Sequence, residues 1–242
     1  MKTASSVACR AACFPTVASV VAILWFQVAF GQDADLSPNA AQPVDLTGKY
    51  LFPISTLTNT NYFAWTAWTT VPSGHQVFRN VPFEIGGQIR LWGEGRSDGY
   101  ASQFPKQIQD IAVNRKFESA YAYHGSGFKS ADGTPVWALV FRYEDGSSAT
   151  NTLRFGADVL DWVVGGTEEP LRTPYGTNSM LAWVGGRYSE KQKNRLRFCI
   201  TALNNPHPDR LVSTMDLISC GSKTAASILA ITTGPADLMK RK

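Results

Sequence analysis

Short apolar runs separated by Gly, Asn, Asp and Pro dominate the chain after its first 43 residues. No long stretch repeats its apolar residues with the 3.6-residue period of a helix. This spacing predicts an all-β fold, a single sandwich or jelly roll. The runs lie at 48–54, 77–85, 88–93, 108–114, 119–125, 135–143, 151–156, 180–186, 195–203, 210–218 and 227–233.

The most regular part of the pattern is a hairpin around Asp145 and Gly146. A three-residue turn over 144–146, with Gly146 in the left-handed region, pairs Tyr143 with Ser147 and Leu139 with Asn151. A two-residue turn at Asp145 and Gly146 is the alternative, and it flips the second strand. We prefer the first register because it gathers the bulkiest apolar side chains on one face. That face carries Trp137, Leu139, Phe141, Tyr143, Leu153 and Phe155.

The opposite face of this hairpin is mixed in character. We interpret it as a solvated sheet face, with a shallow binding surface as the alternative that makes Arg142 and Arg154 candidate ligand residues. Its members are Val136, Val140, Arg142, Thr150, Thr152 and Arg154.

Residues 1–31 have the layout of a secretory signal peptide. Lys2 and Arg10 precede an apolar run of 14 residues, Val17–Phe30, and small residues precede an expected cleavage between Gly31 and Gln32. The run is shorter than the roughly 20 residues of a spanning helix, and an uncleaved anchor is the alternative. We therefore expect a secreted or periplasmic protein with no membrane span after cleavage.

The mature chain has little net charge. Removing Lys2 and Arg10 from the 23 basic residues leaves 21 against 19 acidic ones, so the net charge falls from +4 to +2. This balance offers no electrostatic basis for binding nucleic acid.

We expect a disordered lead-in over 32–43, one sandwich domain over 44–234 and a frayed basic tail over 235–242.

Four segments resemble bacterial extracytoplasmic β-sandwich modules related to the galactose-binding-like and NPCBM-type carbohydrate-binding domains. They are "VPFEIGGQIRLWG", "FRYEDGSSATNTLRFGADVLDW", "MLAWVGG" and "NNPHPDRLVSTMDLIS" followed by "AITT". The matching features are the Tyr-x-Asp-Gly turn at 143–146, the Asp161-Trp162 pair, an Ala-Trp pair and the proline loop 205–209. The resemblance implies a non-catalytic, monomeric module that binds a glycan or another envelope component, without defining its binding residues. A structural or protein-docking sandwich is the alternative.

Tryptophans are the candidate sugar-binding plates, because sugars stack their apolar C–H surfaces on aromatic rings. Trp65 and Trp68 are three residues apart, so on a strand they would face opposite sides and one of them could be exposed. Trp162 follows Asp161 in a predicted loop at a sheet edge, where a hydrogen-bond acceptor and a ring could act together. Burial over the sandwich ends is the alternative for each of them, and Trp137 and Trp183 are expected in the core.

No catalytic or metal-binding motif stands out. His75, His124 and His207 are isolated, and "HGSG" at 124–127 is interpreted as a turn with a surface histidine rather than an oxyanion loop. In the proline loop, Asp209 is expected to accept backbone hydrogen bonds. We expect no cofactor, and structural Ca²⁺ remains an open alternative although no contiguous acidic loop is present. A disulfide between Cys199 and Cys220 requires their strands to lie in different sheets or Cys220 to fold back.

Overall fold

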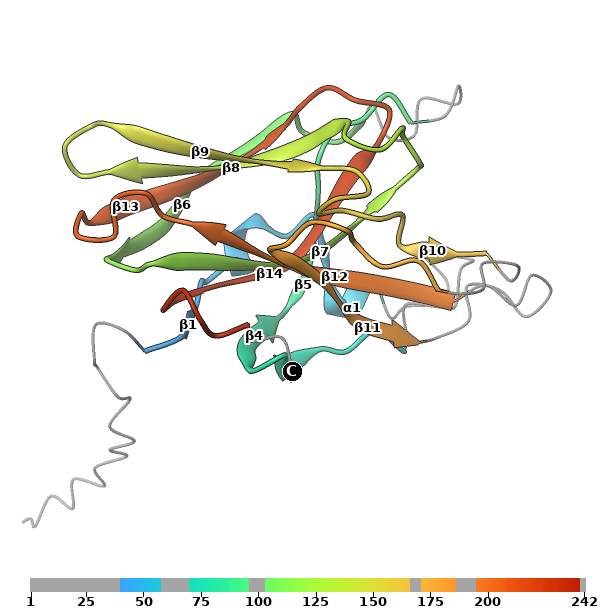
Figure 1. The fold of residues 1–242 in the computed structure, drawn as a ribbon, viewed down its shortest axis with the longest axis horizontal. Coiled ribbons are helices and arrows are strands. Elements are labelled where there is room, and N and C mark those ends of the chain that lie inside the picture. Colours follow the sequence, from blue (N-terminus) through green and yellow to red (C-terminus); the bar gives the residue numbers. More distant parts are fainter. Residues whose placement is uncertain (1–39, 58–69, 96–102, 166–170, 186–194, 240–242) are drawn as a thin grey trace, which may run out of the picture. The chain divides into compact units, whose positions relative to one another are not determined.

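The computed structural model describes residues 40–57, 70–95, 103–165, 171–185 and 195–239. These residues form an all-β sandwich, as the sequence predicted (Figure 1). The strands are β1 (Gln42–Pro43), β2 (Phe52–Pro53), β3 (Gly74–Phe78), β4 (Val81–Ile85), β5 (Gly87–Arg90), β6 (Gln107–Arg115), β7 (Ser119–Gly127), β8 (Pro135–Tyr143), β9 (Ser148–Arg154), β10 (Val163–Val164), β11 (Ser179–Gly185), β12 (Arg195–Asn204), β13 (Val212–Ser219) and β14 (Ala225–Gly234). The helical segments are η1 (Thr47–Lys49) and α1 (Ile54–Leu57).

Two sheets enclose the main core. The larger has the order β10-β12-β7-β14-β5-β2, with β1 beside β14 and β11 beside β12, and the smaller has the order β6-β13-β8-β9. Ala122 and Ile228 from the larger sheet share one buried cluster with Trp137, Leu139 and Met215 from the smaller. The apolar inner faces of both sheets are thereby removed from water.

The larger sheet is buried on its other face as well. There Tyr121 and Tyr123 of β7 join Phe198 of β12 in a second cluster with Phe83 of the β3-β4 hairpin. Along β7 the small residues point into the sandwich and the tyrosines point away from it, because side chains alternate along a strand. The β3-β4 hairpin therefore acts as a third layer.

The predicted hairpin register is confirmed. Leu139 pairs with Asn151, the Tyr143 N–H bonds to the Ser147 carbonyl at 3.0 Å, and Gly146 has φ of +82°. Two residues depart from the predicted solvated face, since Val140 is only 4% exposed and Val136 is fully buried. Val136 belongs to the main core instead of the outer face, because β8 has a register shift between Pro135 and Trp137 that redirects its side chain.

The ends of the domain are more ordered than expected. The sheet begins at Gln42, where β1 pairs with the last strand, two residues before the predicted boundary. The predicted frayed tail is wrong for residues 235–239. The Tyr121 hydroxyl bonds to the Pro235 carbonyl, and Leu238 packs against the second cluster. Residues 240–242 lie outside the described ranges.

Cys199 and Cys220, the two cysteines within the described ranges, are both free thiols. The strands that follow each other across the proline loop, β12 and β13, lie in different sheets, so the simple hairpin between them does not form. Cys199 is buried whereas Cys220 is exposed, and burial raises the pKa of the Cys199 thiol to about 12.

His124 is a core residue, and the predicted turn with a surface histidine is wrong. It lies inside β7 with no exposed surface, and its Nε2 is 2.9 Å from the Thr201 hydroxyl. The Thr201 hydroxyl lies 2.9 Å from the Ser179 hydroxyl. The Ser179 hydroxyl donates to Asp158 Oδ1 at 3.0 Å. The ring of Trp137 lies edge-on to the imidazole, with centroids 5.5 Å apart. Burial lowers the pKa of His124 to about 3.

This histidine should make the protein less stable in acid. The unfolded chain binds a proton near pH 6.5 and the folded chain only near 3, so protons favour unfolding as the pH falls through this window. We expect the free energy of unfolding to fall by about 1.4 kcal/mol per pH unit from this group alone between about pH 6 and 3.5. Urea unfolding of wild type and His124→Gln at several pH values gives the free energy of unfolding as a function of pH. The slope of this curve should be smaller for His124→Gln than for wild type. Identical slopes for the two proteins would contradict this account.

Candidate functional site

The predicted Asp161-Trp162 site is not an exposed aromatic plate. Trp162 is 7% exposed and belongs to the second cluster, with the Arg90 guanidinium 5.9 Å from its ring. Gly125 lets the Trp162 side chain approach β7, because a Cβ there would meet Trp162 Cβ at 3.3 Å. The Asp161 carboxylate accepts the Val163 N–H at 3.0 Å. Both residues serve local structure.

The other candidate ligand residues lie elsewhere. Arg142 bonds through Nε to the buried Asp216 carboxylate at 2.8 Å, and that carboxylate also accepts the Asp110 N–H at 3.1 Å. Arg154 donates to the Gly133 carbonyl at 2.9 Å. These arginines belong to the smaller sheet, so the structure does not bring them together with Asp161 and Trp162. Trp65 and Trp68 lie outside the described residues.

The other three tryptophans among the described residues offer no open plate either. Trp137 is fully buried, as predicted. Trp183 is only partly buried, stacked on Phe198 with centroids 6.0 Å apart, and Trp92 is partly buried with the Lys106 ammonium 5.3 Å from its ring. An aromatic binding surface built from these residues is therefore not preformed.

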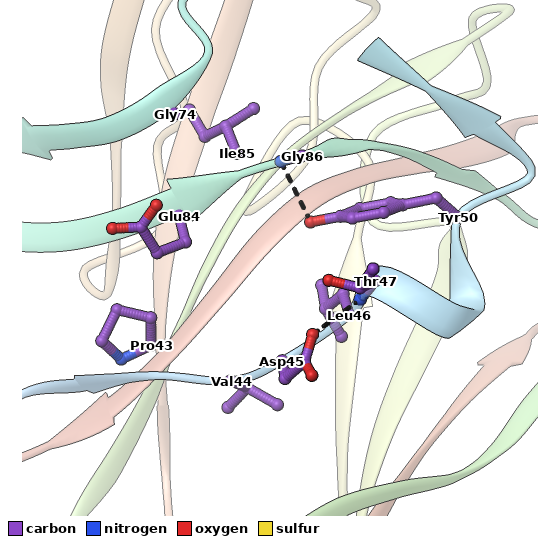
Figure 2. A pocket seen from close by; sticks show the side chains of 10 residues that line it. All are labelled: Pro43, Val44, Asp45, Leu46, Thr47, Tyr50, Gly74, Glu84, Ile85 and Gly86. Carbon is purple, nitrogen blue, oxygen red and sulfur yellow. Dashed lines mark hydrogen bonds between the residues drawn. The ribbon is translucent and has the colours of Figure 1, made fainter. Parts of the chain in front are cut away.

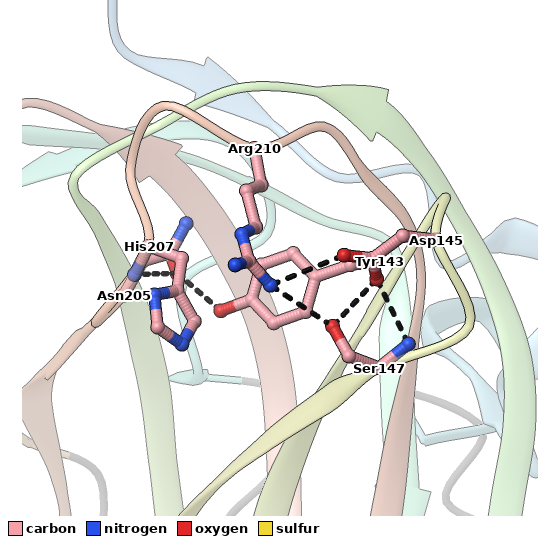
Figure 3. Close-up of polar contacts among 6 residues, drawn as sticks. All are labelled: Tyr143, Asp145, Ser147, Asn205, His207 and Arg210. Carbon is pink, nitrogen blue, oxygen red and sulfur yellow. Dashed lines mark hydrogen bonds and ion pairs between the residues drawn. The ribbon is translucent and has the colours of Figure 1, made fainter.

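Two of the four motifs of the resemblance, the Tyr-x-Asp-Gly turn and the proline loop, meet in space (Figure 3). The Tyr143 hydroxyl donates to Asn205 Oδ1 at 2.5 Å, and the ring of His207 lies edge-on to that of Tyr143. Arg210 reaches Asp145 Oδ2 at 3.1 Å. These contacts join the β8-β9 turn to the loop between β12 and β13.

Asn205 takes the structural role that the sequence assigned to Asp209. It is 5% exposed, its amide donates to the Phe117 carbonyl at 3.0 Å, and its Oδ1 accepts the His207 N–H at 3.0 Å. Within the described part of the chain, Asp209 is exposed and Asn205 makes these loop contacts instead. We call Tyr143, Asn205 and Arg210 the clamp, because their contacts hold the β8-β9 turn against the loop between β12 and β13. The role of the clamp is thus structural.

An open groove that sequence reasoning missed lies between β4 and the segment 43–47 (Figure 2). Its volume is about 390 Å³. The lining is mainly apolar or backbone, with two exposed carboxylates, Asp45 and Glu84. The lining residues are Pro43, Val44, Asp45, Leu46, Thr47, Tyr50, Gly74, Glu84, Ile85 and Gly86.

Tyr50 forms one end of the groove. Its ring lies against Gly86 and Gly87, where a Cβ would come within 2.9 Å of Cε2 and 2.8 Å of Cγ respectively. Its hydroxyl accepts the Gly86 N–H and donates to the Leu229 carbonyl, each at 3.3 Å. Partial burial raises the pKa of this phenol. The ring is therefore fixed before any ligand arrives.

The carboxylates give the groove its charge. Asp45 accepts the Thr47 N–H at 2.9 Å, and hydrogen bonds from Thr47 lower its pKa. Glu84 lies 2.7 Å from Nδ1 of His75 on the neighbouring strand. None of the lining residues is basic, so the groove presents hydrogen-bond acceptors to whatever enters it.

Two further findings concern the described residues alone. They contain no group of three or more His, Cys, Asp or Glu side chains placed to hold a metal ion. Their helical segments include none with the length and apolar character of a membrane span.

Comparison with known proteins finds no family model and no curated protein that matches the chain. The resemblance to galactose-binding-like and NPCBM-type domains therefore stays a prediction.

The structural role of the clamp is testable by substitution. Asn205→Ala removes the acceptor for Tyr143 and the donor to Phe117, leaving buried polar groups without partners. We expect the free energy of unfolding to fall by roughly 2 to 4 kcal/mol. Chemical denaturation measures this loss. Asp209→Ala in the same loop should change stability by no more than about 0.5 kcal/mol, and equal effects of the two substitutions would show that Asn205 has no special role.

Proposed function

We propose that this protein is a non-catalytic, extracytoplasmic carbohydrate-binding module whose ligand site is the groove between β4 and residues 43–47. The observation that carries the proposal is the groove itself, with its preformed walls and exposed carboxylates. Its volume of about 390 Å³ lies within the roughly 300 to 1,000 Å³ usual for ligand sites.

The chemistry of the lining suits a sugar. Sugar hydroxyls donate hydrogen bonds, and Asp45 and Glu84 supply acceptors that form the stronger, charge-assisted kind. The apolar walls, among them Pro43 and Tyr50, suit the C–H surfaces of a sugar ring. Because Tyr50 is already held by Gly86 and Leu229, little side-chain freedom is lost there on binding.

Export to the periplasm or the cell exterior is part of this proposal. It rests on the signal-like pattern of residues 1–31. The non-catalytic part of the proposal rests on the isolated histidines and the lack of a catalytic motif in the sequence.

A protein-docking or structural sandwich is the second candidate. The observation that favours it is the burial of Trp162, which removes one of the aromatic plates expected of a lectin. In that case the groove would receive a polypeptide segment instead of a sugar.

The proposal predicts saturable binding of the purified protein to at least one member of a glycan array or an insoluble polysaccharide. In the variant Asp45→Asn plus Glu84→Gln, affinity should fall by about tenfold or more, because two charged acceptors are lost. Asp209→Asn is the matched control, since it removes an exposed carboxylate outside the groove and should bind like wild type.

Other outcomes decide between the candidates. Binding that survives the double substitution but is lost in Trp162→Phe would place the site at the Asp161-Trp162 pair instead. Absence of binding to every glycan tested would favour the protein-docking candidate.

A further inference from the structure

The two edges of the smaller sheet differ in how they are protected. β6 is one edge, and its register with β13 shifts twice. Asp110 and Asn114 in β6 have φ of 56° and 50°, in the left-handed region. Such irregularities bend an edge strand and prevent another strand from pairing with it.

β9 is the opposite edge and has no such protection. Its pairing with β8 is regular from Ser148 to Leu153, and this stretch contains neither a charged residue nor a proline. Figure 1 shows β9 at the border of its sheet, beside β8. A flat, uncharged edge is a template for strand addition.

The alternation of hydrogen bonds between β8 and β9 identifies the backbone groups of β9 that do not bond to β8. Since the Tyr143 N–H bonds to the Ser147 carbonyl, the odd-numbered residues of β9 bond to β8. The N–H and C=O groups of Ser148, Thr150 and Thr152 then point away from β8, where no described strand pairs with them. All three residues are exposed.

The open edge ends at Arg154. The N–H of Arg154 bonds to Asp158 Oδ2 at 2.8 Å, and its carbonyl accepts the N–H groups of Asp158 and Val159 at 2.9 and 3.1 Å. The loop that follows β9 therefore closes the edge on that side. The free segment is confined to residues 148–152.

We propose that this edge pairs with the β9 edge of a second copy of the chain, forming an antiparallel two-fold dimer centred on Thr150. In this register Thr150 lies opposite its own counterpart and Ser148 lies opposite Thr152. Hydroxyl pairs of this kind stabilise neighbouring strands. The two smaller sheets become one continuous sheet across an isologous interface.

Charge complementarity favours a second copy in this orientation. The register sets the exposed Arg154 of each copy opposite Gly146 of the other, beside the exposed Glu144, which is the carboxylate left for it because Asp145 already pairs with Arg210 at 3.1 Å. Parallel pairing would instead place like charges together. The sequence pattern led us to expect a monomer, and the dimer does not depend on the groove or its ligand.

Sedimentation velocity over a concentration series reaching about 1 mM tests the dimer, because an interface of one strand pair is expected to be weak. The wild-type mass should rise from one chain toward two. Thr150→Lys and Thr150→Glu alone should each weaken association at least about tenfold, since like charges then face each other across the axis. An equimolar mixture of the two variants should associate again.

Ala112→Lys is the matched control, because Ala112 is exposed on the opposite edge strand of the same sheet. It should associate like wild type. A wild-type protein that stays monomeric throughout the series overturns the proposal. Association of Thr150→Lys at wild-type strength, or a mixture that stays monomeric, also overturns it.

Discussion

Burial of the larger sheet on both faces is the constraint on which the rest of the described structure depends. β7 and β14 lie in the middle of that sheet, and every residue of both strands is buried. A sheet with two apolar faces needs a cover on each. The smaller sheet covers one face, and the β3-β4 hairpin with the segment 235–239 helps to cover the other.

The groove and the free edge arise from how these covers are built. Segment 43–47 follows β1, which is fixed beside β14, and β4 packs on the second cluster. Val44 and Leu46 of that segment belong to the main core, so the open volume that Asp45 and Glu84 border lies where the two clusters meet. On the other side, β8 and β13 fill the main core, which leaves β9 to form the border of its sheet. The binding proposal and the dimer proposal therefore concern separate sets of residues.

Local features were predictable from the sequence, and non-local ones were not. The β8-β9 register followed from Gly146 and the bulky residues near it, because hairpin pairing depends on neighbours in the chain. His124 was misplaced because "HGSG" looks like a turn, and only pairing with β12 and β14 makes it a buried strand. The groove joins residues 43–50 to 74–86, and no periodicity reports such a contact. Trp162 was expected at an open edge, but its burial depends on β7 glycines distant in sequence.

The central claim is that the groove between β4 and residues 43–47 is the ligand site. Backbone amide NMR of the labelled protein, titrated with the best-binding glycan from the array, tests it most directly. We expect the largest shifts at Asp45, Thr47, Glu84 and Gly86, with little change at Asp161 and Trp162. Saturable shifts centred on any other surface, with the groove amides unmoved, would contradict the account.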